Sequence, residues 1–108
     1  MALHPPEDDL AQRAAGAAEL LRLVGNEHRL QVLCVLRAGE ASVGDLARRL
    51  GLSPSALSQH LARLRAARLV EGRREAQTIY YRIIDRTVLA LVEALAQIMD
   101  QRRAGGRA

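Results

Sequence analysis

The fold of this 108-residue chain is decided by residues 42–66, which read SVGDLARRLGLSPSALSQHLARLRA. Apolar residues recur there at helical spacing in two segments, and a turn that contains glycine separates them. Ser53 is a favoured N-cap for the second segment, and Pro54 fits its first helical position, where no backbone N–H is needed. The stretch therefore predicts two short helices, 43–50 and 54–67, that form a helix-turn-helix.

The second of these helices is expected to carry two unlike faces. At about 100° per residue, Leu57, Leu61 and Leu64 fall on one apolar stripe. Small or hydrogen-bonding side chains occupy the N-cap and the remaining surface: Ser53, Ser55, Ser58, Gln59, Ala62, Arg63 and Ala66. Such a face can approach the DNA major groove closely, where glutamine and serine hydrogen-bond base edges. The alternative is an ordinary solvated face, which usually carries more charge and fewer serines.

His60 lies beside the apolar stripe of this helix rather than opposite it. This position favours a structural role, or a hydrogen bond to a phosphate or to a neighbouring hairpin, over base recognition. We therefore include His60 among the DNA-binding candidates, with the structural role as its alternative.

A β-hairpin is predicted after the helix-turn-helix. Residues 69–73 and 78–83 are β-branched or aromatic runs with alternation, and residues 74–77 separate them. The expected tip offers side chains suited to phosphate or minor-groove contacts: Arg73, Arg74, Gln77 and Thr78. A hairpin that follows a recognition helix is a wing. A merely solvated tip is the alternative, because Glu75 partly cancels the charge there.

The rest of the chain is expected to be mostly helical, within a single domain that spans residues 1–108. Apolar periodicity predicts three further helices, over residues 8–24, 27–37 and 86–103. The middle one is apolar almost all round and is predicted to be the central core element. The ends, 1–7 and 104–108, are expected to be flexible tails. The predicted fold class is therefore mainly α with a small β-hairpin.

The positive charge is concentrated in one third of the chain. Arginine supplies all 16 positive charges, against 12 acidic residues. The segment 53–86 contains seven arginines and three acids, so it holds the whole formal net charge of +4. A concentrated positive field attracts a polyanion such as nucleic acid, although a solvated surface can have a similar composition.

Several classes of protein are disfavoured by what the sequence lacks. The one cysteine, Cys34, cannot form an internal disulfide, and no apolar run approaches the roughly 20 residues of a membrane helix. We therefore expect a cytoplasmic protein with no membrane partner. No Gly-rich phosphate loop, HExxH, Ser/His/Asp set or CxxC pair occurs, which argues against an enzyme. A winged helix that binds another protein, without specific DNA binding, is the remaining alternative.

The stretch ASVGDLARRLGLSPSALSQHLARLRAARLVEGRREAQTIYYRI resembles the winged helix-turn-helix of the ArsR/SmtB family of bacterial transcriptional repressors. The resemblance covers about residues 20–99 and is densest in SALSQHLARLR and RREAQTIYYRI. Within the family, these segments are most similar to the subgroup of NolR-, BigR-, SqrR- and HlyU-like regulators. The resemblance implies a homodimer that binds an inverted-repeat operator near a promoter, with an inducing signal that weakens binding.

The sensory sites of the family are only partly present. Metal-sensing members carry a Cys-x-Cys-type pair at residues corresponding to 40–46, or Asp and His ligands along the last helix. Here 40–46 read EASVGDL, and 85–101 contain no His and no Cys, so we expect no metal site of the familial kind and no cofactor. Sulfur-sensing members pair two cysteines, and Cys34 matches only the first. Cys34 is therefore either a core residue or a lone thiol sensor.

A dimer is also expected from the apolar stripes on the first and last helices. The last helix carries a broad stripe: Val88, Leu91, Val92, Leu95, Ile98 and Met99. A chain of this size cannot bury both stripes in one small core, so one of them should pack against a partner copy. The alternative is that both complete an intramolecular core. Dimerisation through these helices would present two recognition helices to successive major grooves.

Overall fold

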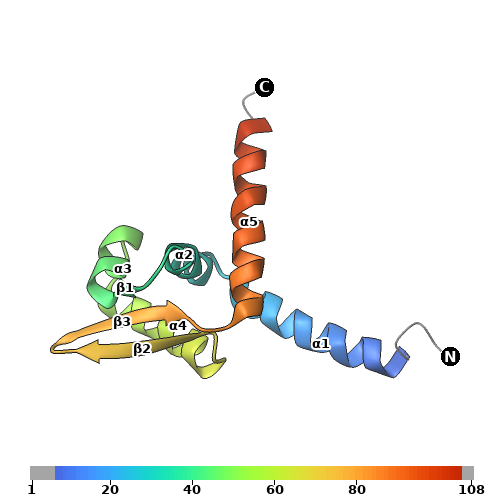
Figure 1. Cartoon of the computed structure of the whole chain (residues 1–108), viewed down its shortest axis with the longest axis horizontal. Helices are drawn as coiled ribbons and strands as arrows, with labels where there is room; N and C mark the ends of the chain where they lie inside the picture. Colours follow the sequence, from blue (N-terminus) through green and yellow to red (C-terminus); the bar gives the residue numbers. More distant parts are fainter. Residues whose placement is uncertain (1–6, 106–108) are drawn as a thin grey trace.

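The structure is a computed structural model that describes residues 7–105, and within them it contains five helices and one antiparallel sheet (Figure 1). The elements, in chain order, are α1 (Glu7–Val24), α2 (Glu27–Leu36), β1 (Ala41–Ser42), α3 (Val43–Leu50), α4 (Pro54–Ala66), β2 (Val70–Glu75), β3 (Thr78–Ile83) and α5 (Arg86–Gly105). The predicted fold class, a mainly helical winged helix-turn-helix with a small hairpin, is confirmed. We call the hairpin of β2 and β3 the wing.

Capping residues fix where three of the helices begin and where α3 ends. Asn26 Oδ1 accepts hydrogen bonds from two backbone amides in the first turn of α2, at 3.0 and 3.1 Å. Ser42 Oγ caps α3 and Ser53 Oγ caps α4 in the same way, at 3.0 and 3.2 Å. Gly51 ends α3 with a φ of 65°, a conformation that glycine adopts without a steric penalty. These caps fix the turn between α3 and α4.

A short strand that the sequence did not predict, β1, extends the hairpin to a three-stranded sheet. The strand order is β1-β3-β2, with Ala41 opposite Tyr81 and Ser42 opposite Tyr80. Two residues are too few to show the alternation that marks a strand in a sequence. Ser42 is both the last residue of β1 and the N-cap of α3, so the sheet is fixed to the start of the helix-turn-helix.

The turn of the wing is shorter than the predicted four residues. β2 continues through Arg74 and Glu75, so only Ala76 and Gln77 lie between the strands. Ala76 has a φ of 57°, in the left-handed region where two-residue turns usually place glycine or asparagine. Because neither Ala76 nor Gln77 is a glycine or an asparagine, the sequence contains no signal for a two-residue turn here.

The core lies where α2 meets the helix-turn-helix, the sheet and the base of α5. Leu57, Leu61 and Leu64 of α4 are buried, as predicted from their spacing. α2 contributes the completely buried Val32 and Leu33, which confirms its predicted central place. The resulting core is almost entirely aliphatic.

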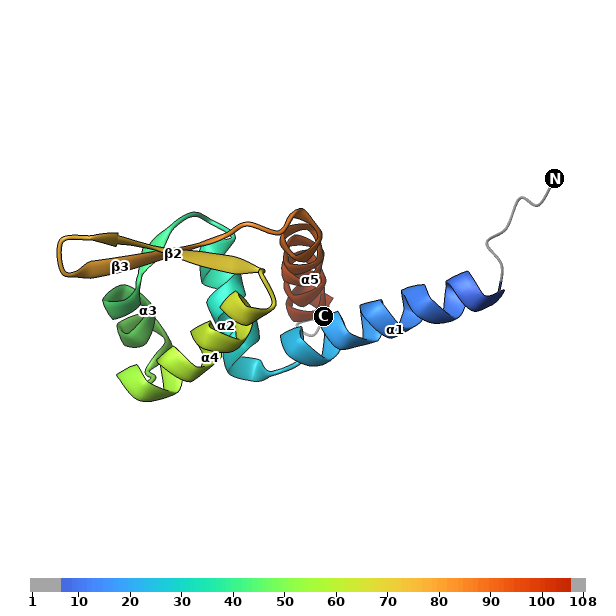
Figure 2. The ribbon, with the colours of Figure 1, turned by 90° about the horizontal axis from the view of Figure 1, so that it is seen from below.

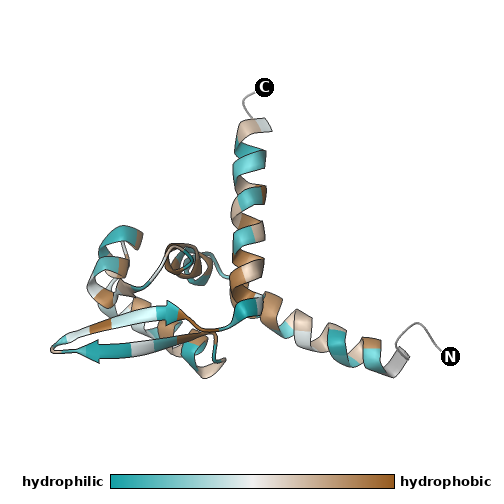
Figure 3. Ribbon diagram, in the orientation of Figure 1, coloured by the Kyte–Doolittle hydropathy of each residue, from teal (hydrophilic) through white to brown (hydrophobic). Residues whose placement is uncertain are grey.

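Most of α1 and the outer part of α5 stand away from this core. In Figures 1 and 2, α1 extends from one side of the body and α5 projects at an angle to it. The radius of gyration is 16.5 Å, against about 13 Å for a compact chain of this length. Figure 3 shows apolar residues along both helices. Leu10 and Leu21 of α1 are 59% and 57% exposed, and Ile98 and Met99 near the end of α5 are 47% and 45% exposed.

Residues 7, 104 and 105, which the sequence analysis assigns to the tails 1–7 and 104–108, lie within helices. Glu7 begins α1, and α5 continues through Ala104 and Gly105. The remaining parts of both predicted tails, 1–6 and 106–108, lie outside the described residues. Among the helices that the structure describes, none is long and apolar enough to cross a bilayer.

Candidate nucleic-acid interface

The exposed face of α4 matches the predicted recognition face. The exposed side chains on this face are Ser55, Ser58, Gln59 and, nearer the end of the helix, the small Ala62. The leucine stripe faces the core. Ser53 is also exposed, but its hydroxyl is already used as the helix N-cap. The face thus offers hydrogen-bonding groups on a surface that has no bulky side chain to hold a duplex away.

A groove of about 710 Å³ runs between α3, α4 and the wing. Its polar lining includes Arg48 of α3, Ser58 and Arg65 of α4, and Gln77 and Thr78 at the wing turn, together with Ser42 of β1 and Tyr81 of β3. The groove thus brings together three of the predicted residues. It also adds two arginines that the sequence analysis did not single out. Cationic and hydroxyl groups in a groove next to a recognition helix are suited to phosphate contacts.

Arg65 links the recognition helix to the wing. Its Nη1 donates a hydrogen bond of 2.9 Å to the hydroxyl of Tyr81, which is 5% exposed. Arg65 lies next to the apolar stripe on the helix, and only the position of Tyr81 on the packed wing reveals its role. Arg48 is more exposed and forms an ion pair of 3.2 Å with Asp45 on the same helix.

The two faces of the wing differ, because alternate residues of each strand point to opposite sides of the sheet. The register places these residues together on the inner face, toward the helices: Val70, Gly72, Arg74, Ile79, Tyr81 and Ile83. The outer face carries Glu71, Arg73, Glu75, Thr78, Tyr80 and Arg82. A Cβ at position 72 would lie 3.0 Å from Cζ of Tyr81, so glycine there allows the tyrosine ring to lie across the strand.

Arg73, a predicted DNA contact, is engaged within the protein. Its Nη2 and Nε donate to the Glu40 carboxylate at 2.5 and 3.2 Å, and its Nη1 donates to Glu75 at 2.5 Å. The guanidinium carbon also lies 4.8 Å from the centre of the Tyr80 ring. The hydrogen bonds to Glu40 and Glu75 raise the pKa of Arg73, and the bond to Arg73 lowers the pKa of Glu40.

Arg74, the next residue, is on the inner face and exposed. Within the part of the chain that the structure describes, no ion pair or hydrogen bond joins the Arg74 side chain to another group. Of the two arginines that the sequence placed at the tip, Arg74 is therefore the one whose charge is free to meet a ligand. Arg82, on the outer face, pairs with Glu71.

His60 faces α2, and among the described residues no hydrogen bond joins it to the wing. Its ring centroid lies 5.5 Å from that of His28, and the planes are tilted by 45°. The Nδ1 atoms of both rings are buried and have no hydrogen-bond partner among the described residues. Burial, followed by the positive charges of Arg29, His28 and Arg63, lowers the pKa of His60. These surroundings favour the structural role.

Arg63, the remaining arginine predicted on the recognition helix, is exposed. It follows His60 by three residues and so lies on the flank of α4 that faces α2, where its charge lowers the pKa of both His60 and the buried Arg29. Arg29 Nε donates to the carbonyl of Leu23 at 2.6 Å, and this bond ties α2 to the end of α1. Arg63 therefore borders the recognition face on the side opposite to the groove.

Cys34 is partly buried on α2 and packs against the core. Burial raises the pKa of its thiol, and the nearby charge of Arg37 offsets only part of this effect. A raised pKa lowers the fraction of reactive thiolate, which supports the core role over the sensor role. Among residues 7–105, no cluster of three or more His, Cys, Asp or Glu side chains could hold a metal ion.

A helix-turn-helix with a small polar recognition face, followed by an arginine-bearing wing, defines a winged helix protein of the DNA-binding class. A model of the arsR family of bacterial regulatory proteins matches residues 26–72, which span α2 to the first part of the wing. The transcriptional activator HlyU of Vibrio cholerae serotype O1 is 47% identical over 86% of this chain and 86% of its own length. The chain belongs to the arsR family of bacterial regulatory proteins.

Two solved structures extend this relationship to the fold. The transcriptional repressor BigR from Xylella fastidiosa is 36% identical, covers 90% of this chain and 96% of its own, and gives a TM-score of 0.81. The homodimeric winged helix-turn-helix domain of Mb0332 from Mycobacterium bovis is 31% identical, covers 94% and 93%, and gives a TM-score of 0.73. The predicted resemblance to the subgroup that includes HlyU and BigR is confirmed, and this family is one of transcriptional regulators.

Proposed function

We propose that this protein is a repressor that binds an inverted-repeat operator in double-stranded DNA as a homodimer. The observation that carries the proposal is the exposed small polar face of α4, bordered by a groove lined with arginine. No bulky residue blocks this face, so it can enter a major groove while the groove beside it receives a phosphate strand.

The residues divide into two roles under this proposal. Gln59 and Ser58 read base edges, with Ser55 beside them, because they are exposed on the face opposite the buried leucines. Phosphate contacts come from the surrounding residues: Ser53, Arg63, Arg74, Gln77, Thr78, and the groove arginines Arg48 and Arg65. Base contacts set specificity, and phosphate contacts set affinity and position.

The proposed dimer forms through α1 and α5. Their outer apolar residues, including Leu21 and Ile98, are about half exposed in the single chain. Covering this surface with a second copy would remove an energetically unfavourable apolar patch from water. A two-fold dimer would also present two copies of α4 to the two halves of an inverted repeat. The homodimeric state in the name of the Mb0332 structure supports this arrangement.

Selection from a random duplex pool provides both the operator and the test. Duplexes enriched by the protein should contain an inverted repeat with half-sites roughly 10 base pairs apart. Fluorescence anisotropy then compares the selected duplex with a scrambled one between 50 and 200 mM salt, conditions chosen because phosphate contacts make binding salt-dependent. Equal binding of the two duplexes at every salt concentration would contradict the proposal. An absence of salt-sensitive duplex binding would support the protein-binding alternative instead.

Two further measurements test the dimer and the direction of regulation. Ile98→Glu should shift sedimentation equilibrium toward the monomer, because it places a charge in the proposed interface. Ile84→Glu places the same charge at an isoleucine of similar exposure outside both helices, and should leave the dimer intact. A reporter gene behind the selected operator should be less active with the protein than without it; higher activity would indicate an activator.

A further inference from the structure

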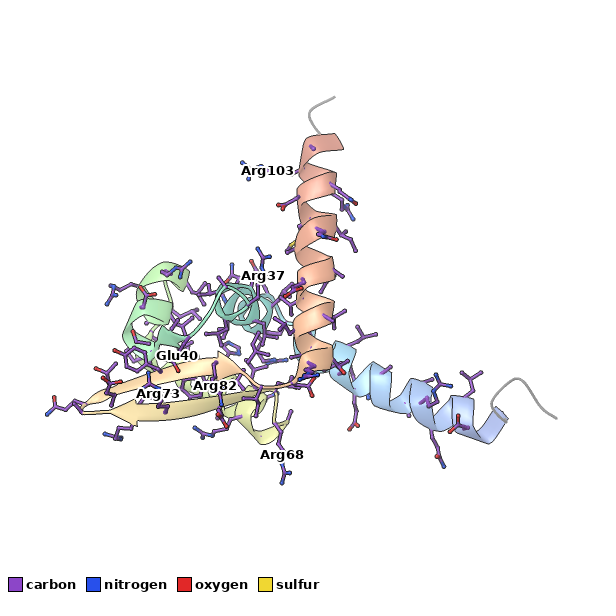
Figure 4. All side chains as sticks on the ribbon, in the orientation of Figure 1. Arg37, Glu40, Arg68, Arg73, Arg82 and Arg103 are labelled. Carbon is purple, nitrogen blue, oxygen red and sulfur yellow. The ribbon has the colours of Figure 1, made fainter. Side chains whose placement is uncertain are left out.

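The Arg73 side chain spans the sheet on its outer face. Arg73 lies on β2, directly opposite Tyr80 of β3, and its guanidinium lies over the Tyr80 ring. From there it reaches the carboxylate of Glu40, the residue just before β1. Figure 4 shows Glu40 and Arg73 close together over the sheet, with Arg82 next along the wing. One side chain thus links β2, β3 and the residue that leads into β1.

This connection lies at the point where the wing leaves the three-stranded part of the sheet. β1 pairs only with Tyr81 and Tyr80, so the hairpin beyond Tyr80 has no third strand beside it. A two-stranded hairpin is marginally stable without other support. On the inner face, the bond from Arg65 to Tyr81 holds the wing to α4. On the outer face, Arg73 and Glu40 provide the corresponding connection.

The charges around Arg73 also disfavour the binding of a phosphate to this residue. Three of its guanidinium nitrogens donate to carboxylates, two to Glu40 and one to Glu75. One arginine and two glutamates together carry a net negative charge, which does not attract DNA. A phosphate could bind Arg73 only by replacing carboxylates that are already in bidentate or short contact.

We propose that Arg73 is a positioning residue, anchored by Glu40, that sets the angle at which the wing leaves the sheet and so places Arg74 and Gln77 against DNA. This inference rests on the proposed DNA binding. It replaces the sequence-based prediction that Arg73 itself contacts a phosphate. Glu40, an acidic residue, thereby supports binding to a polyanion.

The test relies on the direction in which the affinity for DNA changes. Removing a negative charge near DNA should strengthen binding, unless that charge holds the wing in place. Glu40→Gln should therefore weaken binding to the selected duplex about threefold, as Arg73→Gln does, and the double variant should bind no more weakly than either single variant. Glu71→Gln is the matched control. It removes an acid from the same face but leaves the anchor intact, so it should not weaken binding.

The salt dependence separates the two roles of Arg73. In an Arg74→Gln background, loss of a further phosphate ligand would reduce the slope of log affinity against log salt by about another 0.9, whereas loss of the residue that positions Arg74 leaves the slope unchanged. Tighter binding by Glu40→Gln, or a further reduced slope for Arg73→Gln in that background, would overturn the proposal.

A second measurement does not depend on DNA. Amide hydrogen exchange of the free protein should become faster in the distal hairpin, residues 74–79, in both Glu40→Gln and Arg73→Gln, and not in Glu71→Gln. Unchanged exchange would overturn the positioning role. If the unmodified protein fails to bind any duplex, the proposed function is wrong, and exchange alone still decides whether the anchor holds the wing.

Discussion

The inner and outer faces of the wing both carry arginine, but the two faces differ in whether those arginines have acidic partners. On the outer face, Arg73 and Arg82 are paired with glutamates. On the inner face, Arg74 is exposed and has no ion pair within the described chain, and the groove beside it contains Arg65. The positive charge that can meet DNA is therefore on one face, although neighbouring residues in the sequence supply both faces.

This difference shows why a net charge is an incomplete guide to a binding surface. The segment 53–86 carries the whole net charge of the chain, and the sequence alone assigns that charge equally to each of its arginines. In the structure, Glu40, which lies outside the segment, neutralises Arg73. The location of the partners, rather than the number of arginines, decides which charges are available.

The largest expected effect comes from neutralising the arginines of the groove together with Arg74 on the inner face of the wing. A triple variant, Arg48→Gln, Arg65→Gln and Arg74→Gln, should reduce the salt slope by up to about 2.7, because each phosphate contact contributes about 0.9. Affinity at low salt should fall at least a hundredfold. Arg82→Gln on the outer face is the control. If Arg82→Gln reduces the salt slope as much per residue as the triple variant does, the two faces do not differ in the way the structure indicates.

The next largest effect separates recognition from positioning within the interface. Gln59→Ala should lose about 1–3 kcal/mol of discrimination between the selected and scrambled duplexes, because a bidentate base contact disappears. Ser58→Ala should act in the same direction. Arg74→Ala should weaken binding to both duplexes by a similar factor. Competition titrations measure all three, and the reverse pattern would show that α4 and the wing have exchanged roles.

The helix-turn-helix could be predicted from the sequence because its determinants are local. Serine caps and a leucine stripe act within a few residues, so Ser53 and the buried face of α4 were located correctly. The interface around Arg65 could not be predicted, because its groove is assembled from residues 42–48, 58–65 and 77–81, which are separated in the chain. The engagement of Arg73 depends on Glu40, 33 residues away, and no local pattern indicates such a pair.

His60 shows the same limit. Its angle on α4 correctly placed it on a flank, but the sequence could not identify the opposing element, which is α2 and not the wing. The structure shows a half-buried imidazole near positive groups on two helices: His28 and Arg29 on α2, and Arg63 on α4. The described residues place no acid among the charges that act on it. This environment makes the stability of the fold sensitive to acid.

The free energy of unfolding should accordingly decrease as the pH falls below about 6.5. The pKa of His60 is lowered in the folded state, so the unfolded state binds the proton more readily. The contribution is fully present above 6.5 and is lost as the pH falls toward the lower, folded-state pKa. Urea unfolding of the parent and of His60→Gln between pH 5 and 8, a range set around the ordinary histidine pKa, measures it.

The result for His60→Gln should be a flatter pH profile than that of the parent. Glu40 does not interfere, because its pKa is lowered from the ordinary value of 4.5 and its contribution is lost only at more acidic pH. Identical slopes for the two proteins would show that His60 does not control acid stability.

The smallest effect on DNA binding is expected from Cys34→Ser. The groove is lined by residues of β1, α3, α4, β3 and the turn of the wing, and none comes from α2, where Cys34 lies. Affinity in reducing buffer should therefore stay within a few-fold of the parent. The hydroxyl would replace a partly buried thiol, so the variant should lose about 1 kcal/mol of stability.

The response of Cys34 to oxidation is a separate measurement. Because burial raises the pKa of the thiol, we expect the parent and the variant to respond equally to oxidant or persulfide. Release of DNA by the oxidised parent alone, with a mass shift at Cys34 that a reductant reverses, would instead identify a lone thiol sensor.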